Sequence, residues 1–110
     1  MQHPRGGVRS LSKSLANDWA RDGIRVNCLS LGFVGKGMTK KSYDDLQRRY
    51  YNESMMLIKK GDSLDDIANA CMFLCSDASG HTTGQDLYVD GGRTIKSFPD
   101  FDQILSFLKD

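Results

Sequence analysis

Cysteine and histidine are the first side chains in this 110-residue chain that could do chemistry, as ligands of a metal ion. Cys71 and Cys75 are four residues apart, so a helix would place them on the same face, one turn apart. A structural metal site usually needs four ligands, and His3 and His81 lie far from this pair and form no HxxxH motif. We therefore predict no metal site. We expect the three cysteines, Cys28 included, to be small buried core residues.

A glycine-rich segment is the second place where the residues favour a binding role. The segment LGFVGKGMTKK, residues 31–41, has three glycines within seven residues, which is typical of a loop that follows a strand. It also carries Lys36, Lys40 and Lys41. These lysines either favour an anionic substrate or belong to an ordinary solvated loop, and we prefer the solvated loop.

The net charge of +1 is divided unevenly along the chain. Residues 1–61 contain twelve Lys and Arg against five Asp and Glu, a net charge of +7. Residues 62–110 contain three against nine, a net charge of −6. The basic half could bind an anionic ligand, but equally the two halves could attract each other or form two solvated faces. Because aromatic residues are not interleaved with the basic ones, we expect no more than weak, non-specific nucleic-acid binding.

The composition is that of an ordinary globular protein, with one domain at most. Hydrophobic residues make up 39% and charged residues 26%, which excludes the disordered and membrane classes. The longest apolar run, IANACMFLC, is too short to span a bilayer, and the first residues lack the apolar region of a secretory signal. We therefore predict a cytoplasmic protein with no membrane partner.

The first half of the chain predicts a helix, a strand and a second helix. Residues 7–22 place four apolar side chains on one helical stripe, and Gly23 is a favourable residue to end the helix. Residues 24–30, IRVNCLS, alternate as a strand does. Residues 42–56 show a weaker helical period, within a segment of about residues 36–60 that we interpret as a substrate lid. The stripe of the first helix consists of Val8, Leu11, Leu15 and Trp19.

The second half predicts a helix, a strand and a further helix. Ser63 begins a capping box for a helix whose apolar surface is broad enough to need cover on two sides. The strand DLYVDGG, residues 86–92, ends in a glycine pair, and residues 93–110 form a tail that contains a further amphipathic helix. The apolar surface of the capped helix comprises Ile67, Ala68, Ala70, Cys71, Met72, Leu74 and Cys75.

This order of elements predicts an α/β fold with a parallel sheet, since a helix followed directly by a strand is half of a crossover unit. Two parallel strands are too few to form a sheet alone, because parallel strands are normally covered on both faces and flanked by neighbours. We therefore expect an unpaired edge on the strand at residues 24–30. We also expect exposed apolar surface on the first helix.

Four stretches, in this order and spacing, resemble the carboxyl-terminal half of the classical short-chain dehydrogenases/reductases. They are the helix LANDWA, the strand start IRVN, the GFV loop, and the pair TG and VDGG. The resemblance covers about residues 7–92, with residues 1–6 as an unmatched start and residues 93–110 as an added tail. It implies a single partial domain with part of a doubly wound, Rossmann-like parallel sheet, about two strands with covering helices.

The resemblance also implies NAD or NADP as the cofactor, and a small carbonyl or alcohol as the substrate of the parent enzyme. The family binds the cofactor phosphates with a glycine-rich turn in its amino-terminal half. These 110 residues contain no GxxxGxG motif. The choice between NAD and NADP is made in that same half, so it cannot be read from this chain.

The family's catalytic Tyr-x-x-x-Lys aligns with Met1 and Arg5 of this chain. The reaction needs a phenol made more acidic by a nearby cation, so that it can exchange a proton with the substrate oxygen. Methionine has no such proton, and Arg5 is a rigid fork rather than a compact ammonium. We therefore assign no catalytic residue to this chain.

The family's contact with the nicotinamide carboxamide is the part that is retained. It comes from the backbone after a strand, usually in a Pro-Gly-x-x-x-Thr stretch. Here Leu31 replaces the proline and Lys36 the threonine, while Gly32 and the backbone of Val34 remain as the predicted cofactor-binding residues. A turn without any ligand is an equally good interpretation of this stretch.

Three hypotheses for function remain open. The chain is part of an NAD(P)-dependent oxidoreductase that is inactive alone; or it is a non-catalytic interaction or oligomerisation protein derived from that family; or, least favoured, it binds nucleic acid. In the family the helix equivalent to residues 7–22 packs against a second subunit. The partner that we predict is therefore a second copy of this chain or a full-length relative.

Overall fold

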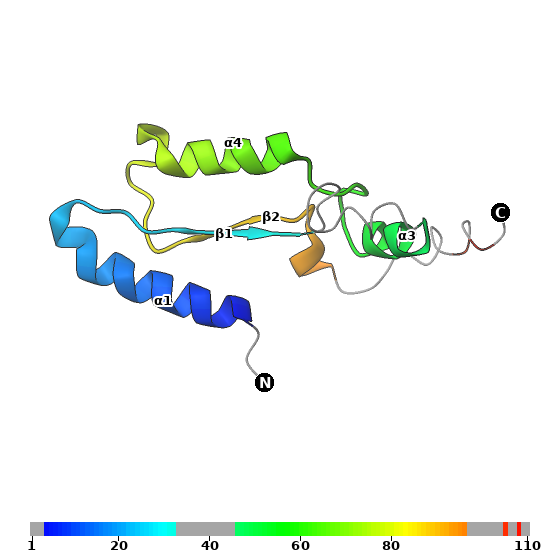
Figure 1. Ribbon diagram of the computed structural model, residues 1–110, viewed down its shortest axis with the longest axis horizontal. Coiled ribbons are helices and arrows are strands. Elements are labelled where there is room, and N and C mark those ends of the chain that lie inside the picture. The colour runs from blue at the N-terminus through cyan, green and yellow to red at the C-terminus, as the bar shows by residue number, and fades with distance from the viewer. Residues whose placement is uncertain (1–3, 33–45, 97–104, 106–107, 109–110) are drawn as a thin grey trace. The chain divides into compact units, whose positions relative to one another are not determined.

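The computed structural model describes residues 4–32, 46–96, 105 and 108. Its elements follow the predicted order, with a two-stranded sheet and helices, which confirms the α/β class (Figure 1). The described residues divide into two units, residues 4–30 with 68–88, and residues 31–67 with 89–108. The elements are α1 (Pro4–Trp19), η1 (Ala20–Asp22), β1 (Cys28–Leu31), α3 (Leu46–Ser54), α4 (Leu64–Cys75), η3 (Asp77–Ser79), β2 (Asp86–Val89) and η4 (Arg93–Ile95).

The sheet consists of β1 paired with β2. The Cys28 N–H donates to the Gln85 carbonyl at 2.8 Å, and the Gly32 N–H donates to the Val89 carbonyl at 3.1 Å. From the first bond to the second, the donor and the acceptor both move four residues towards the carboxyl terminus. The two strands are therefore parallel, as predicted. This register brings the end of β1 beside the end of β2.

β1 is shorter than the predicted strand, and side-chain hydrogen bonds at Val26 and Asn27 precede it. The Val26 N–H donates to Thr83 Oγ1 at 3.1 Å, in place of a carbonyl of a neighbouring strand. Asn27 donates from Nδ2 to the Thr82 carbonyl at 3.0 Å and accepts the Gln85 N–H on Oδ1 at 3.0 Å. Such side-chain bonds compete with a regular ladder, so the strand begins only at Cys28.

Both long helices end or begin as the sequence predicts. Gly23 follows η1 with a φ of 75°, a left-handed conformation that glycine adopts without strain. At the start of α4, the Ser63 N–H donates to Asp66 Oδ2 at 3.1 Å and the Asp66 N–H donates to Ser63 Oγ at 3.0 Å. This is a capping box with Asp in place of Glu. The hydrogen bonds from Ser63 hold the pKa of Asp66 below its ordinary value.

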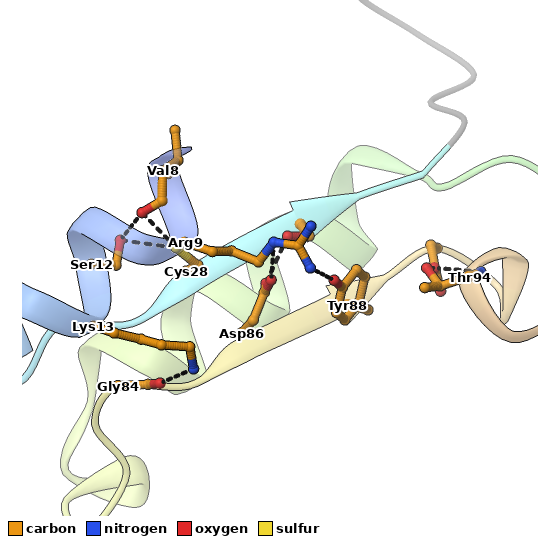
Figure 2. Close-up of polar contacts among 11 residues, drawn as sticks. Val8, Arg9, Ser12, Lys13, Cys28, Gly84, Asp86, Tyr88 and Thr94 are labelled. Atoms are coloured by element: carbon orange, nitrogen blue, oxygen red, sulfur yellow. Dashed lines mark hydrogen bonds and ion pairs between the residues drawn. The ribbon is translucent and has the colours of Figure 1, made fainter. Parts of the chain in front are cut away.

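Polar contacts attach α1 to the strands of the first unit (Figure 2). The guanidinium of Arg9 lies 3.4 Å from Asp86 Oδ2 and also donates to the Tyr88 hydroxyl. The Cys28 thiol donates to Ser12 Oγ at 2.9 Å, and Lys13 Nζ donates to the Gly84 carbonyl at 3.0 Å. Each of these contacts joins residues far apart in the sequence, so they fix how α1 lies against the sheet.

Little apolar surface is buried in either unit. The buried apolar side chains among the described residues are Ala16 and Cys28 in the first unit and Met56, which is fully buried, in the second. On α1, Val8 and Leu11 are 59% and 60% exposed and Trp19 is 43% exposed, which confirms that these three residues of the predicted stripe are uncovered, while Leu15 is half-buried. The two strands offer too small a face to bury a helix stripe of this length.

The expectation that all three cysteines are buried is wrong for two of them. Cys28 is buried, but Cys71 and Cys75 are exposed, and no residue of α4 is buried. Met72 on the same helix is 71% exposed. The broad apolar surface of α4 needs cover on two sides. The described elements do not cover this face, so its cysteines are exposed.

The described start of the tail, residues 93–96, is not α-helical. Arg93–Ile95 forms a short 3₁₀ turn, and Lys96 is extended. Leu105 and Leu108 have helical backbone and are exposed, while the other residues of 97–110 lie outside the described residues. Among the helices described, none is long and apolar enough to cross a membrane.

Candidate functional site

Gly32 directly follows β1, at the position predicted to contact a cofactor. Its N–H lies within hydrogen-bonding distance of two acceptors of the second unit, the Val89 carbonyl at 3.1 Å and Asp62 Oδ2 at 3.2 Å. A side chain here would place its Cβ 2.8 Å from the Cα and Cβ of Asp90. The position therefore requires glycine, and a ligand could use the Gly32 carbonyl and the backbone beyond it, but not the Gly32 N–H.

Asp62 and Asp90 flank Gly32 in the second unit, and both are buried. Burial raises the pKa of Asp62, and the charges of Asp66 and Asp90 act in the same direction, while the hydrogen bond from Gly32 acts against them. Burial also acts to raise the pKa of Asp90, but hydrogen bonds from Thr94 and Gly92 outweigh it and lower that pKa. Two neighbouring carboxyl groups thus have their pKa values shifted in opposite directions.

Asp90 organises the turn that follows β2. Its Oδ1 accepts the Gly92 N–H at 3.0 Å, and its Oδ2 accepts the Thr94 N–H at 3.1 Å and the Thr94 hydroxyl. Gly91 and Gly92 have positive φ values of 63° and 83°, which explains the glycine pair in the sequence. The carboxylate therefore satisfies backbone donors that the tight turn leaves unpaired.

The same turn holds the described part of the segment predicted as a lid. The N–H groups of Leu57 and Ile58 both donate to the Gly91 carbonyl at 2.8 Å. Arg93 donates from its guanidinium to Asn52 Oδ1 on α3 at 3.2 Å. Met56, which lies between Asn52 and Leu57 in the sequence, is fully buried. Hydrogen bonds therefore attach residues 46–60 to the turn that follows β2.

The other residues singled out from the sequence are placed only in part. Val34 and Met1 lie outside the described residues, and so do Lys36, Lys40 and Lys41. Arg5 belongs to α1. Within the part of the chain that the structure describes, no three His, Cys, Asp or Glu side chains converge as metal ligands.

Asp62 is the residue that sequence reasoning missed. It lies 30 residues from Gly32 in the chain, and its hydrogen bond to Gly32 depends on the fold of the second unit. The only available signal was the position of Asp62 just before the capping box at Ser63. Asp90 was visible as part of VDGG, but its role in the turn was not.

A family model described as enoyl-(acyl carrier protein) reductase matches residues 1–94, which include all of residues 7–92. The chain belongs to the short-chain dehydrogenase/reductase family. It is 39% identical over 88 residues to a 3-oxoacyl-(acyl-carrier-protein) reductase of Chlamydia trachomatis, covering 80% of this chain and 35% of that protein. It is 35% identical over 92 residues to an NADP-dependent mannitol dehydrogenase of Alternaria alternata, covering 84% of this chain and 34% of that protein.

Solved structures of short-chain dehydrogenases/reductases share the fold. A gluconate 5-dehydrogenase from Burkholderia cenocepacia, in complex with NADP and tartrate, is 35% identical with a TM-score of 0.75, and the match covers 81% of this chain and 35% of that one. The chain thus spans about a third of the length of the relatives it matches. The fold described here is a fragment of the Rossmann-like fold of the family.

Replacing Gly32 by Ala tests the close approach of the backbone to Asp90. Because the new Cβ would lie 2.8 Å from two carbon atoms of Asp90, we expect Gly32→Ala to lower the free energy of unfolding. Overpacking of this kind costs about 1–3 kcal/mol. Chemical denaturation followed by circular dichroism measures it. The matched control is Gly7→Ala in α1, where no atom beyond its own stretch of helix lies within 4 Å of the new Cβ and where Ala favours the helix. Equal stability of the two variants would contradict the geometry.

Replacing Asp62 by Asn tests the raised pKa of that carboxyl. The folded chain raises the pKa above its ordinary 3.8, so protonation of Asp62 stabilises the fold fully below pH 3.8, and this stabilisation is lost as the pH rises through the folded-state value. Asn is always neutral and keeps an oxygen that accepts the Gly32 N–H. We therefore expect Asp62→Asn to be more stable than the parent at pH 7 and to lose that advantage near pH 3.5. Denaturation at both pH values measures it, and lower stability of the variant at pH 7 would refute the assignment.

Proposed function

We propose that this chain is the carboxyl-terminal part of an NAD(P)-dependent short-chain dehydrogenase/reductase, and that it supplies the backbone that faces the nicotinamide. The observation that carries the proposal is the family match over residues 1–94, with the glycine of the nicotinamide contact retained at the end of β1. The Gly32 carbonyl and the backbone of Val34 would form the contact. The Gly32 N–H is paired within the chain and would hold this backbone in place.

The reaction we propose for the whole enzyme is the reduction of a ketone or the oxidation of a secondary alcohol on a small molecule. A relative named for mannitol and NADP and another named for 3-oxoacyl groups support the reaction class, because both reactions interconvert a carbonyl and an alcohol. Residues 36–60 would cover the substrate. The anchoring of residues 57 and 58 to Gly91 fixes one end of that segment.

The chain alone should have neither the proton donor nor the phosphate site of the family. Met1 and Arg5 stand at the tyrosine and lysine positions, and no glycine-rich phosphate loop is present in the sequence. A positioned general acid contributes about 10²- to 10⁴-fold to the rate. Without it, and without a site for the cofactor phosphates, we expect no turnover by the 110 residues.

Titration calorimetry with NADH and NADPH tests this expectation on the purified chain. The expected result is no saturable binding at physiological cofactor concentrations, together with no cofactor oxidation in the presence of carbonyl substrates. The matched experiment uses the chain joined to an amino-terminal half of a family member, which should restore binding. Micromolar affinity of the chain alone would show a cofactor site that the described residues do not explain.

A second function, as a non-catalytic interaction protein of the same family, is favoured by the exposed stripe on α1. Val8, Leu11 and Trp19 are at least 43% exposed, and clustered exposed apolar side chains mark a partner site or an aggregation hazard. A partner with the matching surface is a second copy of this chain or a longer member of the family. This function does not require the cofactor.

Light scattering over a range of chain concentrations tests the association. We expect the chain to self-associate at tens of micromolar, and Leu11→Glu to raise the midpoint concentration about tenfold, which corresponds to about 1.4 kcal/mol. The matched control is Asn17→Glu, which adds the same charge at an exposed position of α1 away from the stripe. A stable monomer with a buried Trp19, or equal effects of the two variants, would refute the proposed surface.

A further inference from the structure

Gly32 has the greatest backbone freedom of any residue type, at a position that has to be fixed if it is to contact a cofactor. The close approach to Asp90 leaves no space for a Cβ, so only glycine fits here. Glycine, however, adopts a wider range of φ and ψ values than any other residue. A dependable backbone contact therefore needs bonds from elsewhere in the chain that hold Gly32 in one conformation.

Two acceptors hold the Gly32 N–H. The Val89 carbonyl, at 3.1 Å, continues the pairing of the two parallel strands. Asp62 Oδ2, at 3.2 Å, is a side-chain acceptor that strand pairing does not require. Hydrogen bonds to a charged acceptor are about twice as strong as those between neutral groups. The bond from Gly32 to Asp62 is thus an addition to the sheet, made at the residue that most needs to be held.

The backbone is fixed on both sides of Asp62. Before it, the Ile58 N–H donates to the Gly91 carbonyl at 2.8 Å. After it, Ser63 forms the capping box that begins α4. Asp62 is itself buried within the second unit, so its bond to Gly32 does not depend on surface that a longer family member would cover. The carboxyl group therefore reaches Gly32 from a backbone that is held at both ends.

A carboxyl group at this place lowers the stability of the fold at neutral pH. Burial raises the pKa of Asp62, because the charged form loses contact with water, and the charges of Asp66 and Asp90 act in the same direction. A neutral side chain of the same shape would avoid this loss. Groups placed at a cost to stability are typical of sites where their position serves function.

We infer that Asp62 is a positioning residue for the nicotinamide contact, because its carboxylate holds the Gly32 N–H and so keeps the Gly32 carbonyl in one orientation. The inference rests on the contact proposed above for Gly32. Asp62 acts through Gly32 and needs no contact of its own with cofactor or substrate. Since Gly32 and Asp62 are 30 residues apart, the same bond joins the two ends of the segment proposed to cover the substrate.

Hydrogen exchange of the Gly32 amide in the 110-residue chain tests the positioning. Asp62→Leu removes the acceptor and fills a similar volume, and we expect it to speed exchange at Gly32 about 10- to 100-fold, the factor that a bond to a charged group contributes. Asp62→Asn keeps an acceptor oxygen and should restore slow exchange. The Cys28 amide, paired with Gln85 in the same sheet, is the internal reference and should not change. Mass spectrometry with single-residue resolution, at low micromolar chain concentration, measures both amides.

The matched control is Asp65→Leu, which removes the same charge at an exposed position three residues away. It should leave exchange at Gly32 unchanged. Equal acceleration at Gly32 and Cys28 in Asp62→Leu would show a general loss of structure and would refute a positioning role. Unchanged exchange at Gly32 in that variant, or fast exchange in Asp62→Asn, would also refute it.

Cofactor binding tests the consequence, with the chain joined to an amino-terminal half of a family member. Asp62→Leu should weaken the binding of NADH or NADPH about tenfold, because a contact that is correctly placed about a tenth of the time binds that much more weakly. Asp62→Asn should rescue the affinity. ADP-ribose and its phosphorylated form lack the nicotinamide, so we expect both variants to bind them as the parent does.

The outcomes of the binding experiment separate this inference from the proposed function. Unchanged affinity for the whole cofactor in Asp62→Leu, or equal weakening with and without the nicotinamide, would refute the role of Asp62. No cofactor binding by the unsubstituted joined chain would instead contradict the proposed function on which the inference rests.

Discussion

The parallel pairing of β1 with β2 is the interaction on which the rest of this structure depends. It joins segments 57 residues apart, through the bonds from Cys28 to Gln85 and from Gly32 to Val89. Parallel strands need a long connection between them, and here that connection carries α3 and α4. Because the carboxyl ends of both strands lie side by side, Gly32 and the turn at Asp90 become neighbours.

A sheet of two strands stabilises its helices differently from a large sheet. Parallel sheets are normally covered on both faces by apolar contacts, but few of the apolar side chains that the structure describes are buried. The contacts that attach α1 to the strands are an ion pair and hydrogen bonds, which involve Arg9, Ser12 and Lys13. The apolar stripe of α1 and the thiols of α4 consequently remain exposed. The self-association that we propose for α1 follows from the same shortage of sheet.

The region around Gly32 combines close packing with buried charge. The backbone approaches Asp90 so closely that no Cβ fits, and Asp62 accepts the Gly32 N–H from another direction. Asp90 meanwhile is fully engaged in its own turn, through Gly92 and Thr94. Gly32, at the end of β1, is therefore held in a fixed position. A fixed position is what a backbone contact to a cofactor requires, because an ordered contact loses less entropy on binding.

The sequence by itself determined the features that depend on residues close together in the chain. The stripe of α1, the left-handed Gly23, the capping box at Ser63 and the glycine pair after β2 all follow from local geometry, and the family was evident from four ordered motifs. Only the tertiary structure decided that β1 begins at Cys28, that Asp62 bonds to Gly32, and that Cys71 and Cys75 are exposed. These features depend on which distant segments meet. A side chain of Asn27 or Asp62 finds its partner 30 or more residues away, and an apolar helix face is buried only if another element covers it.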